Sequence, residues 1–590
     1  MTLAMDDRLS KVPGGDYIPT FMGMGLVVLG FLSIILMFYT NSFLMKQRKR
    51  EFGIYNILGM EKRHVGKVLF HETMMSSTVS IVLGLALGVL FYKFSSLLIC
   101  KLLAVDIIIG FYFITPKTLV PTALFFILID LLTYLFNRIS IAKMKPIELL
   151  QSKSAGEKEP KVKWPLFIIG ILTLVGGYYI SVTTESPLKA LYLFFGAVIL
   201  VIIGTYSLFV TGSIFVLKVL KKNEKFYYNK KHMPAISGLL YRMKQNAVGL
   251  ASIAILATGV LVMISTTVSL YSGMQQTLEQ NYPQHYYIST NYFDENDHLY
   301  NIPADVVQAI IKETADKYRL KIDQMVEQNY LEVSYTYHDG ELITDRSSIS
   351  VEDSLEGLSS FTYITEATFT KLGGEKLNLH KNEVAIYSFS STGDFNEKSI
   401  LLDGNTYSIV EKLNHFPIQS PMATTVKSYG VVVSDASVME TIYQGQKEAY
   451  GDYASEYENR IAVTFSDKEK AMEYGKKIDR DIQESMYKYV ESKTDGTVYL
   501  GGTFSLWEAR EAVYGLYGTL LFLGILLGLV CLFSTALIIY YKQISEGYED
   551  RHRFQIMQKI GMSKEEVKKT IREQIILVFF LPLIVAGIHL

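Results

Sequence analysis

Cysteine is scarce in this 590-residue sequence, and its scarcity excludes one class of protein. The two cysteines, Cys100 and Cys531, each lie inside an apolar run, so a disulfide-stapled secreted scaffold is excluded and both are expected to be small buried hydrophobic residues. Charge is also scarce, because 19% of the residues are charged and 49% are hydrophobic. That balance excludes a disordered, collagenous or purely soluble protein. The basic residues form short clusters beside apolar runs, which disfavours binding to nucleic acid.

Motifs of nucleotide binding and catalysis are missing as well. No Gly-x-x-x-x-Gly-Lys-Ser/Thr occurs, since Gly66-Lys67 is followed by valine and Gly475-Lys476 by lysine. There is no His-Glu-x-x-His, no Cys-x-x-Cys and no Gly-x-Ser-x-Gly, and the ten histidines are scattered. The sequence therefore predicts a chain that is not an enzyme and has no catalytic residue, metal or cofactor of its own.

Long apolar runs are what the sequence has in abundance. A run of about 18 or more residues can cross the roughly 30 Å hydrocarbon core as a helix, because lipid offers no partner for an open backbone N–H. Seven runs qualify, and an eighth, 575–590, reaches the chain end. The seven runs are 21–45, 74–92, 119–136, 164–181, 190–217, 247–270 and 516–541.

The distribution of charge orients these spans. Four segments hold seven or eight lysines and arginines each, and they alternate with three that hold one to three. The rich segments are 46–67, 137–163, 218–246 and 542–572, and the poor ones are 1–20, 93–118 and 182–189. Residues 272–511 carry 39 acids against 21 bases, net −18, which leaves +17 for the rest of the chain. The positive-inside rule places the rich segments in the cytoplasm and the acidic region outside.

The acidic region shows mixed helical and strand patterns. We expect helices over 306–318, opened by Pro303, and over 467–484; we expect buried strands over 429–433 and 460–465. Residues 331–344 have the pattern of a hairpin that turns at Asp339-Gly340. The acid surplus either concentrates cationic solutes or simply keeps an exposed domain soluble. Its tyrosines either bind amphipathic peptides or fill a core; they include Tyr286, Tyr287, Tyr487 and Tyr489. The predicted fold class is a polytopic α-helical membrane protein with one large extracellular α+β domain.

A shift of 502 residues aligns two cytoplasmic pieces of the chain. Seven identities fall in a window of about twenty residues. Phe52, Ile54, Gly59, Met60, Lys62, Val65 and Lys67 match Phe554, Ile556, Gly561, Met562, Lys564, Val567 and Lys569. Each copy has the pattern of a basic helix, a turn at glycine and a second amphipathic segment. One copy alone could equally be a basic anchor at lipid headgroups, but two copies at matched positions favour a docking element for a cytoplasmic partner.

These residues resemble the FtsX-like permease family of ABC transporters. Residues 49–60 resemble the family's Arg-Glu-hydrophobic-Gly…Leu-Gly signature, and 145–150 resemble its Pro-x-Glu-Leu-Leu segment. With one span counted before Met1, the acidic domain follows the seventh span, as in bacitracin-type (BceB-like) permeases, which the block 541–562 also resembles. The second copy departs from the signature, with Arg553-Phe554-Gln555 in place of Glu-Phe-Gly.

The resemblance implies a partner and a function. ATP and Mg would be bound by a separate ABC ATPase, expected as a dimer, and the membrane would be the bacterial plasma membrane with its lipids. The ligand class would be cationic peptide antibiotics that act on the lipid-linked cell-wall precursor cycle. The outcome would be resistance through mechanotransmission, often with signalling to a sensor histidine kinase. The residues expected to couple to the ATPase are Arg50, Glu51, Phe52, Gly59, Met60, Arg553, Phe554, Gly561 and Met562.

The same resemblance suggests how the chain is divided. The expected parts are an extracellular segment at 1–20, a first FtsX-like permease unit of three spans at 21–150, two spans and a cytoplasmic linker at 151–246, a stalk span at 247–271, the extracellular α+β domain at 272–513 and a truncated second permease unit at 514–590. Because the outer first segment lacks a signal peptide and the eighth run is cut short, we expect a fragment. The gene would encode one more span upstream and the equivalent of one to two downstream.

A few residues inside the predicted spans have functional alternatives. Asp130 lies in the third run, where a carboxylate costs a few kcal/mol unless it faces protein, water or a cation. It is expected to pair with a base on a neighbouring span, to lie near the interface, or to serve substrate or coupling. Gly84 and Gly88, and Gly524 and Gly528, have the four-residue spacing that permits close helix packing.

Two other functions stay open at this point. One is a non-transporting membrane sensor that reports ligand to a two-component kinase, which peptide resistance in a cell without the kinase would exclude. The other is an FtsX-type regulator of extracellular wall hydrolases. The position of the acidic domain argues against the regulator.

Overall fold

The computed structural model describes residues 3–5, 9, 14–103, 116–142, 162–184, 187–228, 232–282, 284–294, 298–338, 341–343, 358–389, 395, 397–402, 405–418, 426–451, 454–494, 497–559, 561 and 563–590. The chain divides into two compact units. The helical unit consists of Met1–Gly176, Ile199–Met274 and Glu511–Leu590, and the sheet unit consists of Gly177–Val198 and Gln275–Arg510.

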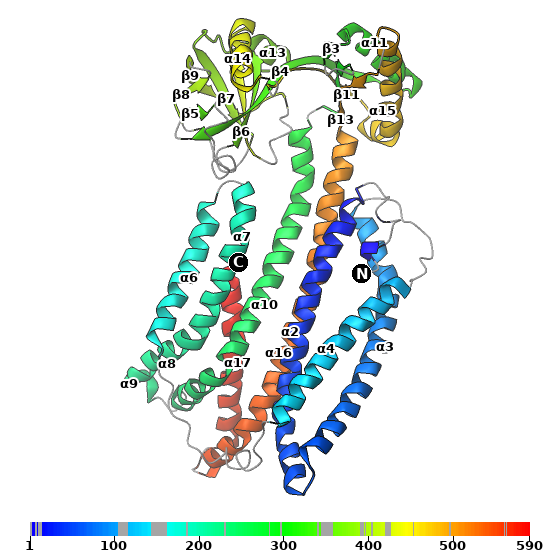
Figure 1. Cartoon of the computed structure of the whole chain (residues 1–590). Coiled ribbons are helices and arrows are strands. Elements are labelled where there is room, and N and C mark those ends of the chain that lie inside the picture. Colours follow the sequence, from blue (N-terminus) through cyan, green and yellow to red (C-terminus); the bar gives the residue numbers. More distant parts are fainter. Residues whose placement is uncertain are drawn as a thin grey trace. The chain divides into compact units, whose positions relative to one another are not determined.

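The chain outside the sheets is built from long apolar helices (Figure 1). They are η1 Leu3–Met5, α2 Tyr17–Ile57, α3 Lys62–Leu102, α4 Pro116–Ala142, α6 Trp164–Thr183, α7 Pro187–Ser207, η2 Leu208–Gly212, α8 Ser213–Lys222, α9 Glu224–Tyr227, α10 His232–Asn281, α16 Leu506–Lys559 and α17 Lys564–His589. Within the described chain, seven stretches are long and apolar enough to cross a membrane. Each overlaps one of the seven predicted runs, so the chain is a polytopic helical membrane protein.

Two details refine the predicted spans. The fifth run is not one regular α-helix, because the π-helical turn η2 joins α7 to α8. The eighth run lies on α17, where Phe580–His589 forms a short apolar helical stretch among the described side chains. Cys100 and Cys531 are both buried, which confirms the expectation that they are small buried hydrophobic residues.

The sheet unit contains a ten-stranded mixed sheet and a small three-stranded one. The large sheet has the order β13-β1-β11-β4-β5-β8-β9-β7-β10-β6, and an additional pairing of β4 with β6 closes seven of these strands into a ring. The strands are β1 Tyr286–Ser289, β2 Asn291–Phe293, β3 Leu299–Asn301, β4 Ile322–His338, β5 Glu341–Ile343, β6 Leu358–Thr365, β7 Glu383–Ser388, β8 Ser399–Leu402, β9 Asn405–Lys412, β10 Lys427–Val433, β11 Tyr457–Phe465, β12 Tyr499–Leu500 and β13 Thr503–Ser505.

The long strand β4 belongs to both halves of this sheet. Its first part pairs with β11, and its second part pairs with β6 and β5, with Leu331 at the junction. The helices of the unit are α11 Ala304–Lys317, α13 Glu366–Lys371, α14 Ala436–Tyr450 and α15 Lys468–Glu491. One core lies between β1, β11, α11 and α15, and a second lies among the ring strands and α14.

The structure confirms most of the secondary structure predicted for the acidic region. Helices α11 and α15 and strands β10 and β11 all lie where the sequence patterns place them, and the region is α+β. Strands β4 and β5 form the expected antiparallel hairpin, while its turn, Asp339-Gly340, lies outside the described residues. Tyr286 and Tyr287 are 0% and 1% exposed and fill the core, whereas Tyr487 is exposed.

Candidate functional site

The first copy of the repeat forms a tight corner between α2 and α3, which we call the first corner (residues 52–67). Helix α2 ends at Ile57, and Gly59 follows in the left-handed region with φ +95°. The Met60 N–H donates to the Tyr55 carbonyl at 2.9 Å, and the Asn56 side-chain amide donates to the Met60 carbonyl at 3.1 Å. The first bond satisfies a carbonyl that the helix end leaves open, and the second ties the last turn of α2 to the residue after the glycine.

The second copy forms the second corner (residues 554–569) between α16 and α17, and the helix ends and the glycine that the structure describes lie at positions equivalent to those of the first. Helix α16 ends at Lys559, Gly561 has φ +110°, and α17 begins at Lys564. Subtraction of 502 gives 57, 59 and 62, which are the equivalent positions of the first corner. In the second corner, Ser563 caps α17 with a capping box that includes Glu566. The duplicated sequence therefore folds into a duplicated structure.

The first corner combines a buried anchor with an exposed tip. Phe52 is 1% exposed and packs with Met45, Val65, Leu69 and Ile141. Val567, the equivalent of Val65, is also buried. The tip of the first corner is apolar and open: Leu58 is 78% exposed, and the other large exposed side chains are Ile54, Tyr55, Ile57 and Met60. Such a contiguous apolar patch beside basic residues is typical of a protein-binding surface.

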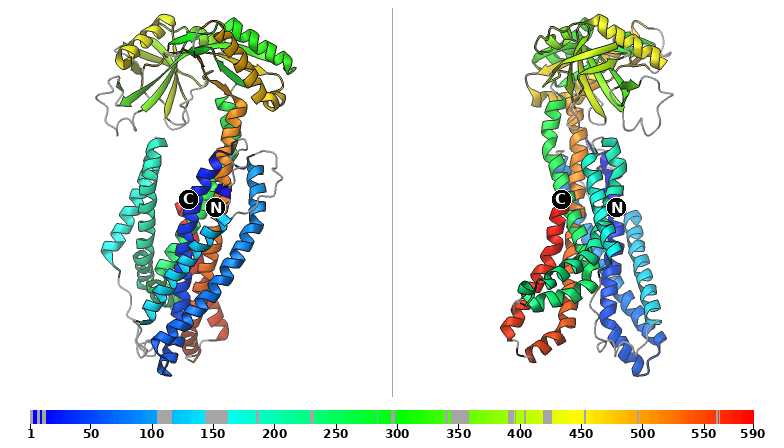
Figure 2. Two further views of the ribbon diagram at one scale, coloured as in Figure 1. Left: turned by 45° about the vertical axis from the view of Figure 1, so that its right-hand side comes forward. Right: turned by 90° about the vertical axis from the view of Figure 1, so that its left-hand side faces the viewer.

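Both corners lie at the same end of the helical unit (Figures 1 and 2). This is the arrangement that the positive-inside rule requires of two cytoplasmic elements, and it lets one partner assembly reach both.

The structure describes only part of the residues predicted to couple to the ATPase. Arg50 lies on α2 and Arg553 on α16, but their side chains are outside the described part, and Met562 is outside it altogether. Glu51 is exposed and lies 3.5 Å from Arg48 Nε, and Phe554 is half-buried on α16. The Pro-x-Glu-Leu-Leu segment at 145–150 also falls outside the described residues.

Asp130 lies on α4, where its side chain faces α3. Its Oδ2 accepts a hydrogen bond from the Ser77 hydroxyl. Asp130 forms no ion pair with another described residue, so none of the basic side chains placed by the structure fills the expected role of a base on a neighbouring span. Its position is also far from both ends of α4, which argues against a place at the interface.

Sequence reasoning missed the polar face that surrounds Asp130. On α4, Thr118, Thr122, Asp130, Thr133 and Asn137 all line one cavity, together with Thr73, Ser76, Ser77 and Ser80 of α3. Asn41 on α2 and Asn137 exchange two amide hydrogen bonds of 2.8 Å. Part of the signal was present, because Thr73, Ser76, Ser77 and Ser80 recur every three or four residues in α3, whereas the polar residues of α4 are more widely spaced. Because serine and threonine have nearly neutral hydropathy, they barely lower the mean hydropathy of these spans, and the polar face does not appear in it.

An ion pair joins α2 to α3 near the first corner. Arg48 Nη1 lies 2.6 Å from Glu72 Oε2, and Arg48 Nη2 donates to Glu72 Oε1 at 3.1 Å. The guanidinium group also lies 5.0 Å from the centre of the Phe52 ring. This bidentate contact links α2 to α3 beside the first corner.

The two predicted glycine pairs differ in how closely a neighbouring helix approaches them. Gly524 and Gly528 on α16 face α10 so closely that an added Cβ would lie 2.6 Å from Thr267 Oγ1 and 3.1 Å from Ile264 Cδ1, respectively. For Gly84 and Gly88, the expectation of close helix packing is wrong within the described chain. An added Cβ there meets no heavy atom within 4 Å, because both glycines line the cavity between α2, α3 and α4.

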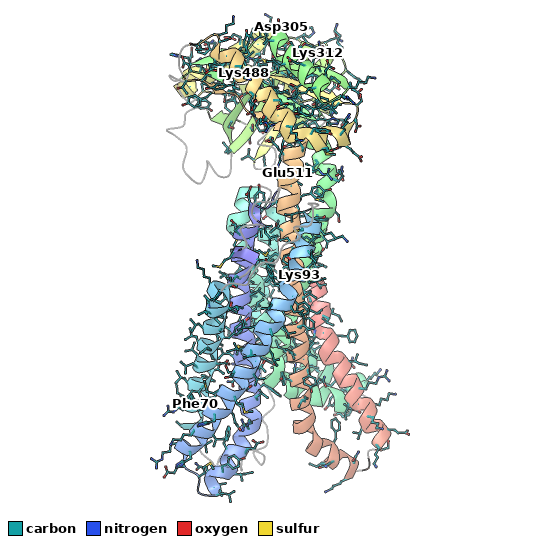
Figure 3. All side chains as sticks on the ribbon, turned by 90° about the vertical axis from the view of Figure 1, so that its right-hand side faces the viewer. Phe70, Lys93, Asp305, Lys312, Lys488 and Glu511 are labelled. Atoms are coloured by element: carbon teal, nitrogen blue, oxygen red, sulfur yellow. The ribbon has the colours of Figure 1, made fainter. Side chains whose placement is uncertain are left out.

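The exposed faces of α11 and α15 carry both acidic and basic side chains, and some acidic residues of the sheet unit are paired internally. Asp305 and Lys312 on α11 and Lys488 on α15 project from the surface (Figure 3). Asp481 is held 2.6 Å from Lys317 Nζ and accepts a hydrogen bond from the Tyr318 hydroxyl. These two hydrogen bonds lower the pKa of Asp481, Lys317 being the larger cause.

Comparison with known proteins adds a family match and a set of relatives. The FtsX-like permease C-terminal family matches residues 23–146, which include the first corner, α3 and α4. The ABC transporter permease protein YxdM of Bacillus subtilis is 26% identical over 571 residues, 95% of this chain and 82% of the relative.

Two further relatives extend over the whole chain. The bacitracin export permease protein BceB of Halalkalibacterium halodurans is 23% identical over 611 residues, and BceB of Bacillus subtilis is 22% identical over 622 residues. Each alignment covers 100% of this chain and 87% of the relative. The resemblance seen in the sequence motifs is thereby confirmed.

Proposed function

The chain is an FtsX-like ABC transporter permease, and on that premise we propose that it recognises peptide antibiotics, or their complexes with cell-wall lipid precursors, and confers resistance by mechanotransmission. As a permease it is a non-catalytic membrane subunit with an ABC ATPase as its partner. The ligand class is supported by the bacitracin export named in two relatives. The acid surplus of residues 272–511 suits a cationic ligand.

One observation carries the coupling part of this proposal: the two corners repeat each other in register at one end of the helical unit. An ATPase dimer presents two copies of the same surface, and a duplicated pair of corners offers two sites of one shape. The open apolar tip around Leu58 supplies a contact that a partner can bury.

Chain continuity supports transmission of movement from the second corner. Helix α16 is continuous from Leu506 to Lys559, and Leu506 directly follows β13, which pairs with β1. Among the described glycines of α16, Gly524 and Gly528 place the helix against α10, so the two helices are closely packed. Movement of α16 at the second corner would therefore move α10 as well. It would reach β13, which precedes α16 in the sequence, and β1, which follows α10.

The coupling proposal is tested by Gly59→Val in the full chain, produced together with its ATPase. Valine at φ +95° costs about 1–2 kcal/mol, and no described atom lies within 4 Å of the added Cβ, so the effect is on the backbone turn alone. We expect normal membrane insertion, with loss of peptide-stimulated ATPase activity and of bacitracin resistance. Gly23→Val is the matched control, because it adds the same side chain to α2 at a helical φ with equally open surroundings.

Normal stimulation and resistance in Gly59→Val would refute the docking role of the corner. The wider proposal is tested separately in cells that lack the histidine kinase. Resistance in those cells supports transport or ligand release by the permease itself. Loss of resistance there, with ATPase coupling intact, would identify the chain as a sensor.

A further inference from the structure

Helices α2, α3 and α4 line a cavity that the proposed coupling function does not use. Its volume is about 960 Å³, near the upper end of the range of about 300–1,000 Å³ typical of ligand pockets. Half of its lining residues carry polar groups, chiefly serine and threonine, but most of the lining surface is apolar. A mostly apolar surface with polar groups at fixed positions is common in ligand-binding pockets. The three helices lie side by side in both views of the unit (Figures 1 and 2).

The polar groups of the cavity reach the middle of the membrane-spanning length. Asp130 lies 14 residues after Pro116 and 12 residues before Ala142 in α4, which is about 21 Å and 18 Å along the helix. The Ser77 hydroxyl is the hydrogen-bond donor that the described structure provides to this carboxylate. An ionised carboxylate at that depth needs a cation or a proton.

The charge of the cavity lining is unbalanced by one. Its acidic and basic side chains are Arg48, Glu72 and Asp130. Arg48 and Glu72 are paired at 2.6 Å and compensate each other. Asp130 is therefore left as one negative charge without a positive partner among the residues that the structure places.

The Thr133 hydroxyl is a second polar group near Asp130 that lacks a partner in the described structure. Thr133 lies three residues further on the same face of α4 and is 6% exposed. Its Oγ1 is buried and has no hydrogen-bond partner in the described structure. A buried hydroxyl without a partner costs about 1–3 kcal/mol, so a ligand that donates a hydrogen bond to this oxygen would remove the cost.

We propose that the α2–α3–α4 cavity binds an amphipathic molecule with a primary ammonium group. Asp130 is its counter-ion, Thr133 Oγ1 accepts one of its N–H donors, and the apolar walls hold its hydrocarbon part. A small anionic headgroup is disfavoured, because it would face the Asp130 carboxylate. The ammonium group could belong to a free lipophilic amine or to an aminophospholipid of the bilayer. The binding site is centred on Asp130, whereas the end of the cavity at Met45, Arg48 and Leu69 adjoins the first corner.

The test uses the full chain in nanodiscs of phosphatidylglycerol, titrated with dodecylamine and, as an uncharged match, dodecanol. We expect dodecylamine to bind more tightly than dodecanol. Asp130→Asn should weaken dodecylamine binding by about tenfold or more, because it removes one partner of a buried charge pair. Thr133→Val should weaken it about threefold, and Gly84→Leu should block it by filling the open space at that glycine. Asp305→Asn, which removes an exposed carboxylate of α11, should change nothing.

Equal affinities for dodecylamine and dodecanol, or unchanged binding in both Asp130→Asn and Gly84→Leu, would overturn the proposal. Gly84→Leu keeps the test decisive if Asp130→Asn fails to fold. The two sources of the ammonium group are separated by adding phosphatidylethanolamine to the nanodiscs. Competition with dodecylamine in the unmodified chain identifies the bilayer lipid as the occupant, and absence of competition identifies a free amine.

Discussion

At the scale of single residues, the sheet unit contains a histidine whose role is visible only in the structure. The Phe465 N–H donates to His285 Nδ1 at 3.1 Å, so the imidazole accepts a backbone hydrogen bond of β11. Burial lowers the pKa of His285 from its ordinary 6.5; nearby Lys468 lowers it further, and Asp323 opposes the shift. The neutral ring is therefore the form that the fold requires.

This arrangement predicts a pH-dependent weakening of the β11 end. The folded pKa is below the unfolded one, so the stabilising contribution is fully present above pH 6.5 and is lost as the pH falls from 6.5 through the lower folded pKa, by up to about 1.4 kcal/mol per pH unit. Hydrogen exchange of the Phe465 amide in the full chain should lose protection between pH 7.5 and 5.5 after correction for the intrinsic rate. His285→Asn keeps an acceptor oxygen at the position of Nδ1 and should remove the extra loss. Equal pH dependence in both chains would exclude His285 as the cause.

At the scale of elements, glycine has two distinct uses that the sequence spacing does not separate. Gly59 and Gly561 provide positive φ at the corners, whereas Gly524 and Gly528 allow α16 to approach α10. Gly84 and Gly88 have the same four-residue spacing as the second pair but do neither. Spacing indicates that a close approach is allowed, and only the position of the neighbouring helix determines whether it occurs.

The contact between α16 and α10 predicts a strong effect of Gly524→Leu. Its Cβ alone would meet Thr267 at 2.6 Å, so the helices must separate or Thr267 must change its rotamer. We expect a loss of about 1–3 kcal/mol, as for other overpacked sites, measured as a lower thermal unfolding temperature of the full chain in detergent. Gly259→Leu adds the same side chain to α10, where no heavy atom lies within 4 Å, and should have little effect. Similar unfolding temperatures for the two variants would contradict the close contact.

The elements also show why only part of the fold follows from the sequence. The apolar runs and the repeated corners are local patterns, so all seven spans and the register of the repeat could be predicted. The double pairing of β4 with β11 and β6 joins residues that are 22 to 143 positions apart in the sequence, which no local period encodes. The polar face of α3 and α4 was encoded locally, but serine and threonine barely change the mean hydropathy of a span.

At the scale of the whole molecule, charge is separated along the chain. Residues 272–511 carry −18 and the remainder +17. A surplus of this size creates a field that extends over a Debye length, which is about 30 Å at 0.01 M salt and about 8 Å at 0.15 M. The acidity of the region thus has a measurable consequence for charged ligands.

If the surplus recruits a cationic peptide antibiotic, its affinity for the full chain should fall as salt is raised from about 0.01 M to 0.15 M. Equilibrium binding to the chain in nanodiscs of neutral lipid measures this directly. The same peptide with its amines acetylated is the control and should show little dependence on salt. A cationic peptide whose affinity is independent of salt would mean that the acidic residues serve only to solvate the domain.

The two corners share one backbone geometry, but they do not share one chemistry. Position 51 is glutamate in the first corner, and its equivalent in the second, position 553, is arginine. An ATPase dimer of two identical protomers would thus contact an acidic residue at the first corner and a basic residue at the second. Once bound, the two protomers would no longer be equivalent, and the complex would be asymmetric. One subunit would always drive α2 and α3, and the other would always drive α16, the helix that leads to the sheets.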